Sequence, residues 1–357
     1  MKKRVLLGMS GGVDSSTSAI LLQEAGYEVI GCTMRLWDPE CDKGESTCCG
    51  SQAVYDAKRV CDKLHIPHYT LNCKSEFKEK VVNNFIEEYL NARTPNPCIE
   101  CNRYLKFGDF YKKAQELECD YIATGHYAKT EFSDKYNQYV LKKSKEIHKD
   151  QSYFLYTMKK EIIEHIIFPL QDYKSKDEIR QIANKNELNV ANKKDSQEVC
   201  FIPDNDYQGF LKRNMNNTNA KNGNIVLTNG DILGKHTGLI NYTVGQRKGI
   251  GISYKEPLYV IKLDKNKNEV VVGTEKELYK SELIANDINW LITKPKENEI
   301  RCYAKIRYRA KEAKAKLLIQ EENVKVTFEE PQRAITPGQS IVFYDEDGTV
   351  LGGGKID

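Results

Sequence analysis

The sequence contains no long apolar run: none of its stretches approaches the roughly 18 apolar residues that a membrane-spanning helix needs. It also begins without a secretory pattern, because Gly and Ser end the short apolar run after Met9 and Asp14 follows. We therefore expect a water-soluble, cytoplasmic protein that does not contact a membrane.

The sequence also lacks an excess of one charge. The chain has 54 basic and 51 acidic residues, and a net charge of +3 neither requires nor excludes a polyanionic partner.

Cysteine, in contrast, is abundant. The chain has eleven cysteines, a high and odd number. Without a secretion signal, this number indicates a reducing compartment in which thiols stay free, act in catalysis or bind metal. Patterning predicts that Cys32 and Cys61 belong to the core, whereas the cysteine-rich run at Cys41, Cys48 and Cys49 has no assigned role.

The length of 357 residues predicts two or three domains, at about 150 residues for each. Short apolar stretches alternate with helical stretches along the first third of the chain. We expect strands at residues 4–9, 27–34, 68–71 and 121–124, and helices at 15–25, 51–64, 77–89 and 107–117. This order predicts an α/β domain with a doubly wound parallel sheet, covered by helices on both faces.

The second half of the chain has a different pattern. An Asn-rich run, NMNNTNAKNGN at residues 214–224, marks a boundary or an exposed loop. Short β-type runs separated by turn residues follow it, including INYTVGQRKGIGI and residues 301–309, 314–320 and 324–328. We predict a catalytic domain at residues 1–205, a small, mostly-β connecting domain at 206–280 and a C-terminal β-barrel at 281–357.

A glycine-rich loop, GMSGGVDSS, lies between the first expected strand and the first expected helix. Small residues let the backbone approach an anion closely, and amide groups at a helix start point toward it. The loop lacks both the Lys-Ser/Thr pair of the GxxxxGK[ST] loop and the GxGxxG spacing. Asp14 stands at the helix start instead, where a carboxylate suits Mg²⁺ on a pyrophosphate. The sequence therefore predicts a phosphate site of another type.

Cys98 and Cys101 form a CxxC pair in RTPNPCIECNRYLKF, and Cys200 follows in DSQEVCFIP. We expect a helix to begin near Asn102, which would place Cys101 at a helix N-terminus, a position that lowers the pKa of a thiol. Two other interpretations remain open: a pair of inert thiols, or half of a zinc site completed by Cys48 and Cys49.

Two segments are basic. Residues 301–317 carry a local charge of +6, and on a strand Lys305, Arg307 and Arg309 would share one face. A second cluster of lysines, at positions 142, 143, 145 and 149, precedes Asp150. A basic stripe backed by an apolar face suits phosphate contact, and a solvated sheet face is the alternative.

Seven motifs together resemble the bacterial tRNA-specific 2-thiouridylase family of the ATP pyrophosphatase (PP-loop) superfamily. They are GMSGGVDSS, TPNPCIECNRYLKFG, ATGHYA, KDQSYFLY, DSQEVCFIP, NYTVGQRKGIGI and RYR. The resemblance covers nearly the whole chain. It implies an N-terminal fold like that of the adenine nucleotide alpha hydrolases, and an enzyme that uses ATP with Mg²⁺ to adenylate the C2 carbonyl of the wobble uridine. Pyrophosphate leaves, sulfur from a cysteine persulfide replaces O2, and 2-thiouridine and AMP are formed.

The resemblance also implies roles for individual residues. Cys200 would carry the persulfide, and Cys101 would be its partner thiol, which either attacks C2 or forms a disulfide with Cys200. The residues expected to bind ATP are Gly8, Met9, Ser10, Gly11, Gly12, Val13, Asp14, Ser15, Met34 and Gly125. Those expected against the extruded base are Asn96, Pro97 and Cys98. Those expected to contact tRNA are His126, Lys149, Asp150, Gln151, Arg307, Tyr308 and Gln339.

Cys98 departs from the family pattern. Many members have an acidic residue there, a proposed general base, and a thiol is a weaker candidate for that role. The substitution produces three cysteines, Cys98, Cys101 and Cys200, that match the ligands of a [4Fe-4S] cluster in related thiolases. A cluster-dependent version of the same thiolation is therefore an alternative.

The partners implied are the anticodon stem-loop of tRNA and a sulfur donor, either a persulfide carrier or a cysteine desulfurase; we expect a monomer. Two other classes compete with this interpretation. One is a small-molecule ATP-dependent synthetase on the same fold, which needs neither the paired thiols nor a basic β domain. The other is a catalytically silent RNA-binding protein, which needs neither the intact loop nor the thiols.

Overall fold

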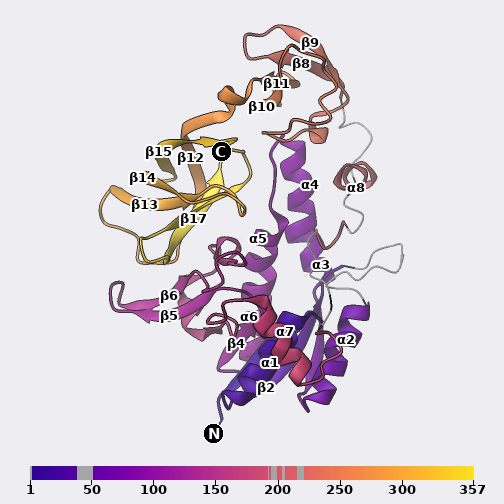
Figure 1. Ribbon diagram of the computed structural model, residues 1–357, viewed down its shortest axis with the longest axis vertical. Coiled ribbons are helices and arrows are strands. Elements are labelled where there is room, and N and C mark those ends of the chain that lie inside the picture. The colour runs from indigo at the N-terminus through magenta and orange to yellow at the C-terminus, as the bar shows by residue number, and fades with distance from the viewer. Residues whose placement is uncertain (1, 38–50, 192, 194–198, 203–205, 215–220) are drawn as a thin grey trace.

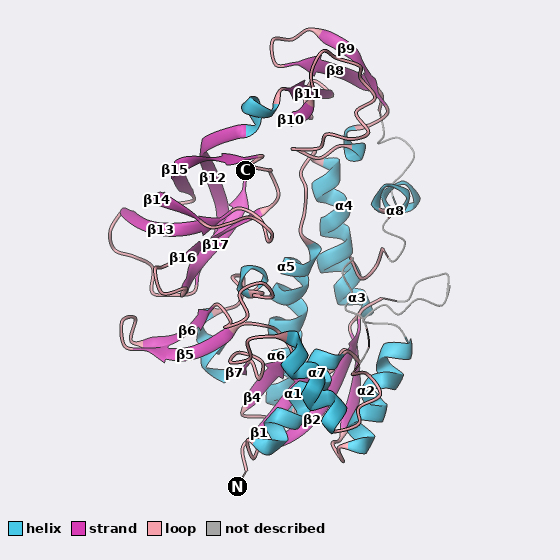
Figure 2. Ribbon diagram, in the orientation of Figure 1, coloured by secondary structure: helices cyan, strands magenta, loops and turns pink. Residues whose placement is uncertain are grey.

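The computed structural model describes residues 2–37, 51–191, 193, 199–202, 206–214 and 221–357. The cysteine-rich run at Cys41, Cys48 and Cys49 lies outside the described residues. A parallel sheet with its helices forms one end of the molecule, and a line of helices rises from it toward a small sheet at the other end (Figure 1). A β-barrel lies beside that line of helices (Figure 2). In the described part of the chain, no helix is long and apolar enough to cross a membrane.

The N-terminal sheet is parallel throughout, as predicted. Its strand order is β3-β2-β1-β4-β7. The strands are β1 (Arg4–Gly8), β2 (Glu28–Arg35), β3 (His68–Asn72), β4 (Tyr121–Thr124) and β7 (Ile166–Ile167). The main covering helices are α1 (Val13–Glu24), α2 (Ser51–Lys63), α6 (Phe110–Glu116) and α7 (Lys176–Lys185).

Side chains of β1 alternate between two cores. Val5 and Leu7 pack with residues of α1, α2 and α7, whereas Leu6 packs with Phe110 of α6 and with Ile122 of β4. Because both faces are buried, the strand is apolar at successive positions, which is typical of a covered parallel sheet. Cys32 and Cys61 are buried, as predicted.

The line of helices consists of two runs. The first contains α3 (Lys74–Phe77), the π-helical η1 (Lys78–Val82) and α4 (Asn83–Leu90). The second contains α5 (Pro97–Cys101) and the π-helical η2 (Asn102–Asp109), and continues into α6. Pro97 is at the first helical position after the N-cap Asn96, where its missing N–H costs nothing. The expected helix start near Asn102 is therefore wrong by about one turn.

Shorter elements connect the sheet to the rest of the chain. The hairpin β5–β6 (Lys129–Ser133 and Gln138–Lys142) follows β4, and η3 (Ser152–Phe154) and η4 (Lys160–His165) come next along the chain. Helix α8 (Tyr207–Asn214) lies against α4, where Tyr207 stacks on Tyr89 with ring centroids 5.4 Å apart.

The central sheet has the order β10-β11-β8-β9. Its elements are β8 (Gly223–Leu227), β9 (Ile232–His236), β10 (Tyr259–Asp264) and β11 (Glu269–Gly273), with the short helices η5 (Leu239–Asn241) and η6 (Glu275–Leu278). The run INYTVGQRKGIGI is not a strand: after η5 it forms turns, and Gly245, Gly249 and Gly251 take positive φ angles.

The C-terminal strands close into a barrel in the order β12-β15-β14-β13-β16-β17, as predicted. They are β12 (Tyr279–Trp290), β13 (Glu299–Lys305), β14 (Ala313–Ile319), β15 (Val324–Arg333), β16 (Ser340–Tyr344) and β17 (Val350–Ile356). Strand β13 ends at Lys305, so the expectation that a strand carries Lys305, Arg307 and Arg309 on one face is wrong.

The barrel is docked on the N-terminal domain through a shared core. Val342, Tyr344 and Val350 of the barrel belong to the same buried cluster as Tyr153 and Phe110. Polar contacts surround this cluster. The guanidinium of Arg93 donates to the carbonyl oxygen of Ile356 at 2.8 Å and forms ion pairs with Glu88 and Asp357.

We predict that Arg93→Ala lowers the free energy of unfolding by roughly 1–3 kcal/mol, because it leaves the Ile356 carbonyl and the half-buried Glu88 carboxylate with fewer partners. Calorimetric unfolding of the full chain measures this change. The control is Lys80→Ala, which removes a solvent-exposed ion pair to Glu79 and should be nearly neutral. Equal midpoints for Arg93→Ala and the unmodified chain would refute the docking role.

Candidate active site

The glycine-rich loop connects β1 to α1 and is held tightly. The amide of Met9 donates to the carbonyl of Cys32, and Thr33 Oγ1 donates to the carbonyl of Met9, both at 2.8 Å. Gly11 has a φ of +68°, and a Cβ there would lie 2.4 Å from the carbonyl oxygen of Ala53. Only glycine fits this turn. The loop is therefore preorganised, with the N-terminus of the twelve-residue helix α1 directed at the space beyond it.

Side chains distant in sequence contact this loop. The carboxylate of Asp14 accepts hydrogen bonds from Tyr127 Oη at 2.9 Å and from Lys176 Nζ at 3.0 Å. Lys193 Nζ donates to the carbonyl of Gly11 at 3.1 Å and to Asp56 at 2.8 Å. Sequence reasoning missed both lysines because no motif surrounds them, and only the fold brings them to the loop.

A cleft of about 330 Å³ opens at the carboxyl ends of the central strands. Ligands of doubly wound folds bind at this edge of the sheet. Residues expected at the site that line it are Gly8, Met9, Ser10, Asp14, Ser15, Met34, Pro97, Cys98, Cys101, Gly125, His126, Gln151 and Cys200. The loop and the three thiols, which are far apart in sequence, thus share one cavity.

Gly125, directly after β4, is held against the loop. A Cβ at Gly125 would lie 2.8 Å from the amide nitrogen of Ser15. This contact allows no side chain, so the backbone of β4 meets the start of α1 directly. Gly11, Gly12 and Val13 form the turn and the first residue of α1, beside the residues that line the cleft.

The three candidate thiols differ in exposure. Cys98 lies in the first turn of α5 and is exposed, Cys101 is buried at the end of α5, and Cys200 is half-buried. Because the helix begins at Pro97, Cys98 occupies the helix start that the sequence assigned to Cys101.

Several other thiols are poor nucleophiles. Burial raises the pKa of Cys32 to about 11 and the pKa values of Cys61 and Cys73 to about 12. A thiol that stays protonated at neutral pH is a poor nucleophile. These three cysteines therefore serve as small core residues.

No three His, Cys, Asp or Glu side chains gather as a metal site among the residues that the structure describes. Cys98, Cys101 and Cys200 line the same cleft but do not form such a group, so this arrangement does not fit a cluster with three cysteine ligands. Cys48 and Cys49, the candidate zinc ligands, lie outside the described residues.

His126 is fixed in the cleft by its neighbours. Its Nδ1 lies 2.7 Å from Thr124 Oγ1, and its Nε2 lies 3.5 Å from Lys106 Nζ. Burial, together with the charge of Lys106, holds the pKa of His126 well below its usual range. At neutral pH the ring is therefore uncharged, and it offers a hydrogen-bond site rather than a charge.

Residues expected to contact tRNA lie mostly outside the cleft lining. Asp150 is buried, and its carboxylate accepts from the amide of Ser144 and the hydroxyl of Ser152, so its side chain stabilises this turn. The lysines near it are largely paired: Lys142 with Glu131 and Asp347, Lys143 with Glu312 and Lys145 with Asp172. Lys149 is half-buried.

The barrel residues of this group also make internal contacts. Arg307 donates to the carbonyls of Arg333 and Ala334 at 2.6 and 2.9 Å. Tyr308 packs on Phe154 with ring centroids 4.5 Å apart. Gln339 donates to the carbonyl of Thr94 at 2.8 Å and so connects the barrel to the segment before α5.

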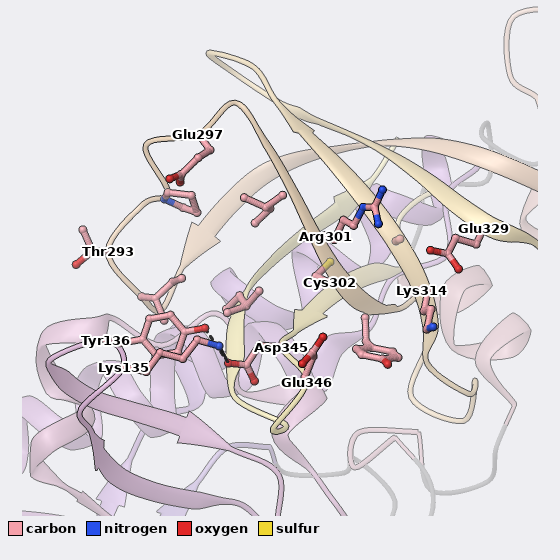
Figure 3. Close-up of a pocket in the computed structure, with 16 residues that line it drawn as sticks. Lys135, Tyr136, Thr293, Glu297, Arg301, Cys302, Lys314, Glu329, Asp345 and Glu346 are labelled. Atoms are coloured by element: carbon pink, nitrogen blue, oxygen red, sulfur yellow. Dashed lines mark hydrogen bonds and ion pairs between the residues drawn. The ribbon is translucent and has the colours of Figure 1, made fainter.

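A larger cavity of about 560 Å³ lies on the barrel, beside the β5–β6 hairpin (Figure 3). Lys135 and Tyr136 both contact the carboxylate of Asp345 there, at 3.0 and 2.7 Å. Its lining includes neither the glycine-rich loop nor the three candidate thiols. Burial raises the pKa of its cysteine, Cys302, to about 12. The smaller cleft is therefore the candidate active site.

Three family models match successive parts of the chain. They are the tRNA methyl transferase HUP domain at residues 3–204, the tRNA methyl transferase PRC-barrel domain at 208–274 and the aminomethyltransferase beta-barrel domain at 280–356.

The chain is also similar to whole proteins named tRNA-specific 2-thiouridylase MnmA. It is 49% identical to that of Clostridioides difficile, covering 100% of this chain and 99% of the relative. It is 51% identical to that of Clostridium botulinum strain Alaska E43, covering 100% and 98%. It is 50% identical to tRNA-specific 2-thiouridylase MnmA 1 of Caldanaerobacter subterraneus, again covering 100% and 98%. With this identity over its whole length, the chain belongs to the tRNA-specific 2-thiouridylase family.

Proposed function

We propose that this protein is a tRNA-uridine 2-sulfurtransferase that uses ATP to replace O2 of the wobble uridine by sulfur. One observation carries the proposal: the glycine-rich loop, Cys101 and Cys200 line the same cleft. A site that only bound nucleotide would not need two thiols beside the loop, and a site for thiol chemistry alone would not need the loop.

The first step activates the base. Uracil O2 attacks the α-phosphorus of ATP, the bond to the β-phosphate oxygen breaks, and pyrophosphate leaves with the electron pair. The loop from Gly8 to Ser15 suits this step because Gly8, Met9, Ser10, Asp14 and Ser15 line the cleft at the N-terminus of α1, where a helix favours an anion. Met34, at the end of β2, and Gly125 border the same space and would contact the nucleotide.

The second step transfers sulfur. The terminal sulfur of a persulfide on Cys200 attacks C2, and AMP leaves with the electron pair of the C2–O bond. Cys101 then attacks the Cys200 sulfur, which leaves a Cys101–Cys200 disulfide and 2-thiouridine. In the alternative order, Cys101 attacks C2 first and AMP leaves with the electron pair of the C2–O bond. The terminal persulfide sulfur then attacks C2 and displaces the Cys101 thiolate, which attacks the Cys200 sulfur and releases 2-thiouridine with the same disulfide. Both routes need two thiols in one cavity, and reduction of the disulfide by a dithiol completes the cycle.

Mg²⁺ would neutralise charge on the pyrophosphate when bound. Asp14, which lines the cleft, is the residue of this chain that would hold it with the phosphates. The three cleft cysteines do not form a metal site in the described structure, so the proposed reaction does not pass through an iron–sulfur cluster.

The substrate and partners follow from this chemistry. A uridine in the anticodon loop must leave its stack for C2 to reach the cleft, and Asn96, Pro97 and Cys98 at the start of α5 would lie against the extruded base. His126, Lys149, Asp150, Gln151, Arg307, Tyr308 and Gln339 stay proposed tRNA contacts. A persulfide carrier or cysteine desulfurase would supply sulfur to Cys200. We infer a cytoplasmic enzyme that acts as a monomer.

We predict that Cys101→Ser and Cys200→Ser each reduce formation of 2-thiouridine by a factor on the order of 100 or more, because each removes a sulfur centre from the relay. Mass spectrometry of nucleosides from tRNA incubated with enzyme, ATP and a persulfide donor measures the product, and ATP binding should not change.

The matched control is Cys119→Ser, since this half-buried thiol does not line the cleft. Full activity of either Cys101→Ser or Cys200→Ser would show that the sulfur route is misassigned. A wild-type enzyme that forms no 2-thiouridine under the same conditions would refute the proposed function.

We predict that Gly125→Ala weakens ATP binding by roughly tenfold or more, since its methyl group meets the backbone of Ser15 and must displace it. Equilibrium binding of ATP measures the effect. The control is Gly234→Ala in the central sheet, where the methyl group meets only the flexible end of Ile252. Unchanged ATP affinity in Gly125→Ala would place the nucleotide elsewhere.

A further inference from the structure

The cleft contains very little positive charge. Among the described residues that line it, Lys106 is the only lysine, and there is no arginine. His126 also lines it but is uncharged at neutral pH. Asp14 also lines the cleft, so a nucleotide polyanion would enter a cavity in which Lys106 is the lining cation among the described residues. Lys106 lies in η2 and is half-buried.

The π-helical geometry of η2 explains how Lys106 reaches the cleft. An α-helix turns once in 3.6 residues, so residues five positions apart point in different directions. A π-helix closes its hydrogen bonds from i to i+5, which brings such residues closer to one face. Cys101, the residue directly before η2, and Lys106 within it are five positions apart, and both line the cleft. Such π-helical turns occur often at functional sites.

His126 holds the ammonium group near the loop. An ammonium group can only donate, so the 3.5 Å contact with Lys106 Nζ makes His126 Nε2 the acceptor and places the ring proton on Nδ1, facing Thr124. Phe107 and Phe168 pack against this ring, with centroids 5.9 and 6.3 Å away. His126 directly follows Gly125, whose backbone meets that of Ser15.

We propose that Lys106 is a catalytic residue whose ammonium group contacts the α-phosphoryl group of ATP and of the adenylated uridine, with His126 as its positioning residue. This inference rests on the proposed function. The α-phosphoryl group takes part in both steps: it accepts uracil O2 when pyrophosphate leaves, and it departs within AMP when sulfur attacks C2. Lys106 lines the same cleft as the loop and the thiols, so one cation serves both steps. It stays protonated, and no proton moves through it.

Two other lysines near the loop are less suited to this role. Lys176 contacts Asp14, and Lys193 contacts Gly11 and Asp56. Neither belongs to the cleft lining in the described structure, whereas Lys106 does. Electrostatic stabilisation acts where charge develops, so the lysine inside the cavity is the one expected to change the rate.

The test compares Lys106→Met and Lys106→Arg with the wild type in single turnover, using tRNA and ATP labelled at the α-phosphate. We expect Lys106→Met to slow tRNA-dependent ATP cleavage by about 100- to 1,000-fold, with ATP affinity changed only a few-fold. Lys106→Arg, which keeps the charge, should stay within about tenfold of the wild type. The control is Lys112→Met, which removes an exposed lysine of the adjoining helix α6, paired with Asp109.

A second readout separates contact from a structural effect. Replacing one non-bridging α-phosphate oxygen of ATP by sulfur should slow the wild type for one of the two diastereomers, and Lys106→Met should lose most of this discrimination. Cleavage by Lys106→Met within threefold of the wild type, or undiminished discrimination, would overturn the inference. Wild-type enzyme that makes no 2-thiouridine would instead refute the proposed function, so the two failures are distinguishable.

Discussion

The close backbone approach of Gly125 to Ser15 is the constraint on which the site depends. Because no side chain separates β4 from the start of α1, the glycine-rich loop and the residues after β4 border one cavity. The same contact places His126, the residue after Gly125, next to the loop. The hydrogen bond between Lys106 and the His126 ring in turn positions the ammonium group. Cys98, Cys101 and Lys106 lie on one continuous helical run, α5 and η2. A shift of this run would therefore move the lysine and two of the thiols together.

The C-terminal barrel takes part in this arrangement from a distance. Gln339 donates to the carbonyl of Thr94, and the amide of Thr94 donates to the carbonyl of Pro337, so the segment that leads into α5 is held by the barrel. The shared core containing Tyr153 and Tyr344 keeps the two domains together. The barrel therefore helps to place the first turn of α5, where Cys98 lies, in addition to any contact it makes with RNA.

Sequence patterns predicted the parallel sheet, the barrel, and the loop and thiols as candidate site residues, since these depend on short-range periodicity and on motifs with strong chemical requirements. Sequence patterns do not predict contacts between distant segments. Nothing in the sequence around Lys176 or Lys193 indicates that these residues contact the loop. The expected helix start near Asn102 is wrong because Pro97 occupies the first helical position, which suits proline. The π-helical turn that directs Lys106 into the cleft has no signature in the local sequence.

In the proposed reaction, one cleft couples nucleotide chemistry to two thiols. The most direct measurement is a single turnover of persulfide-loaded enzyme with tRNA and ATP, stopped with acid and analysed for both nucleosides and protein disulfides by mass spectrometry. The account predicts 2-thiouridine, AMP and a Cys101–Cys200 disulfide in equal amounts. Formation of 2-thiouridine without AMP, or with a disulfide that leaves out Cys101 or Cys200, would contradict it.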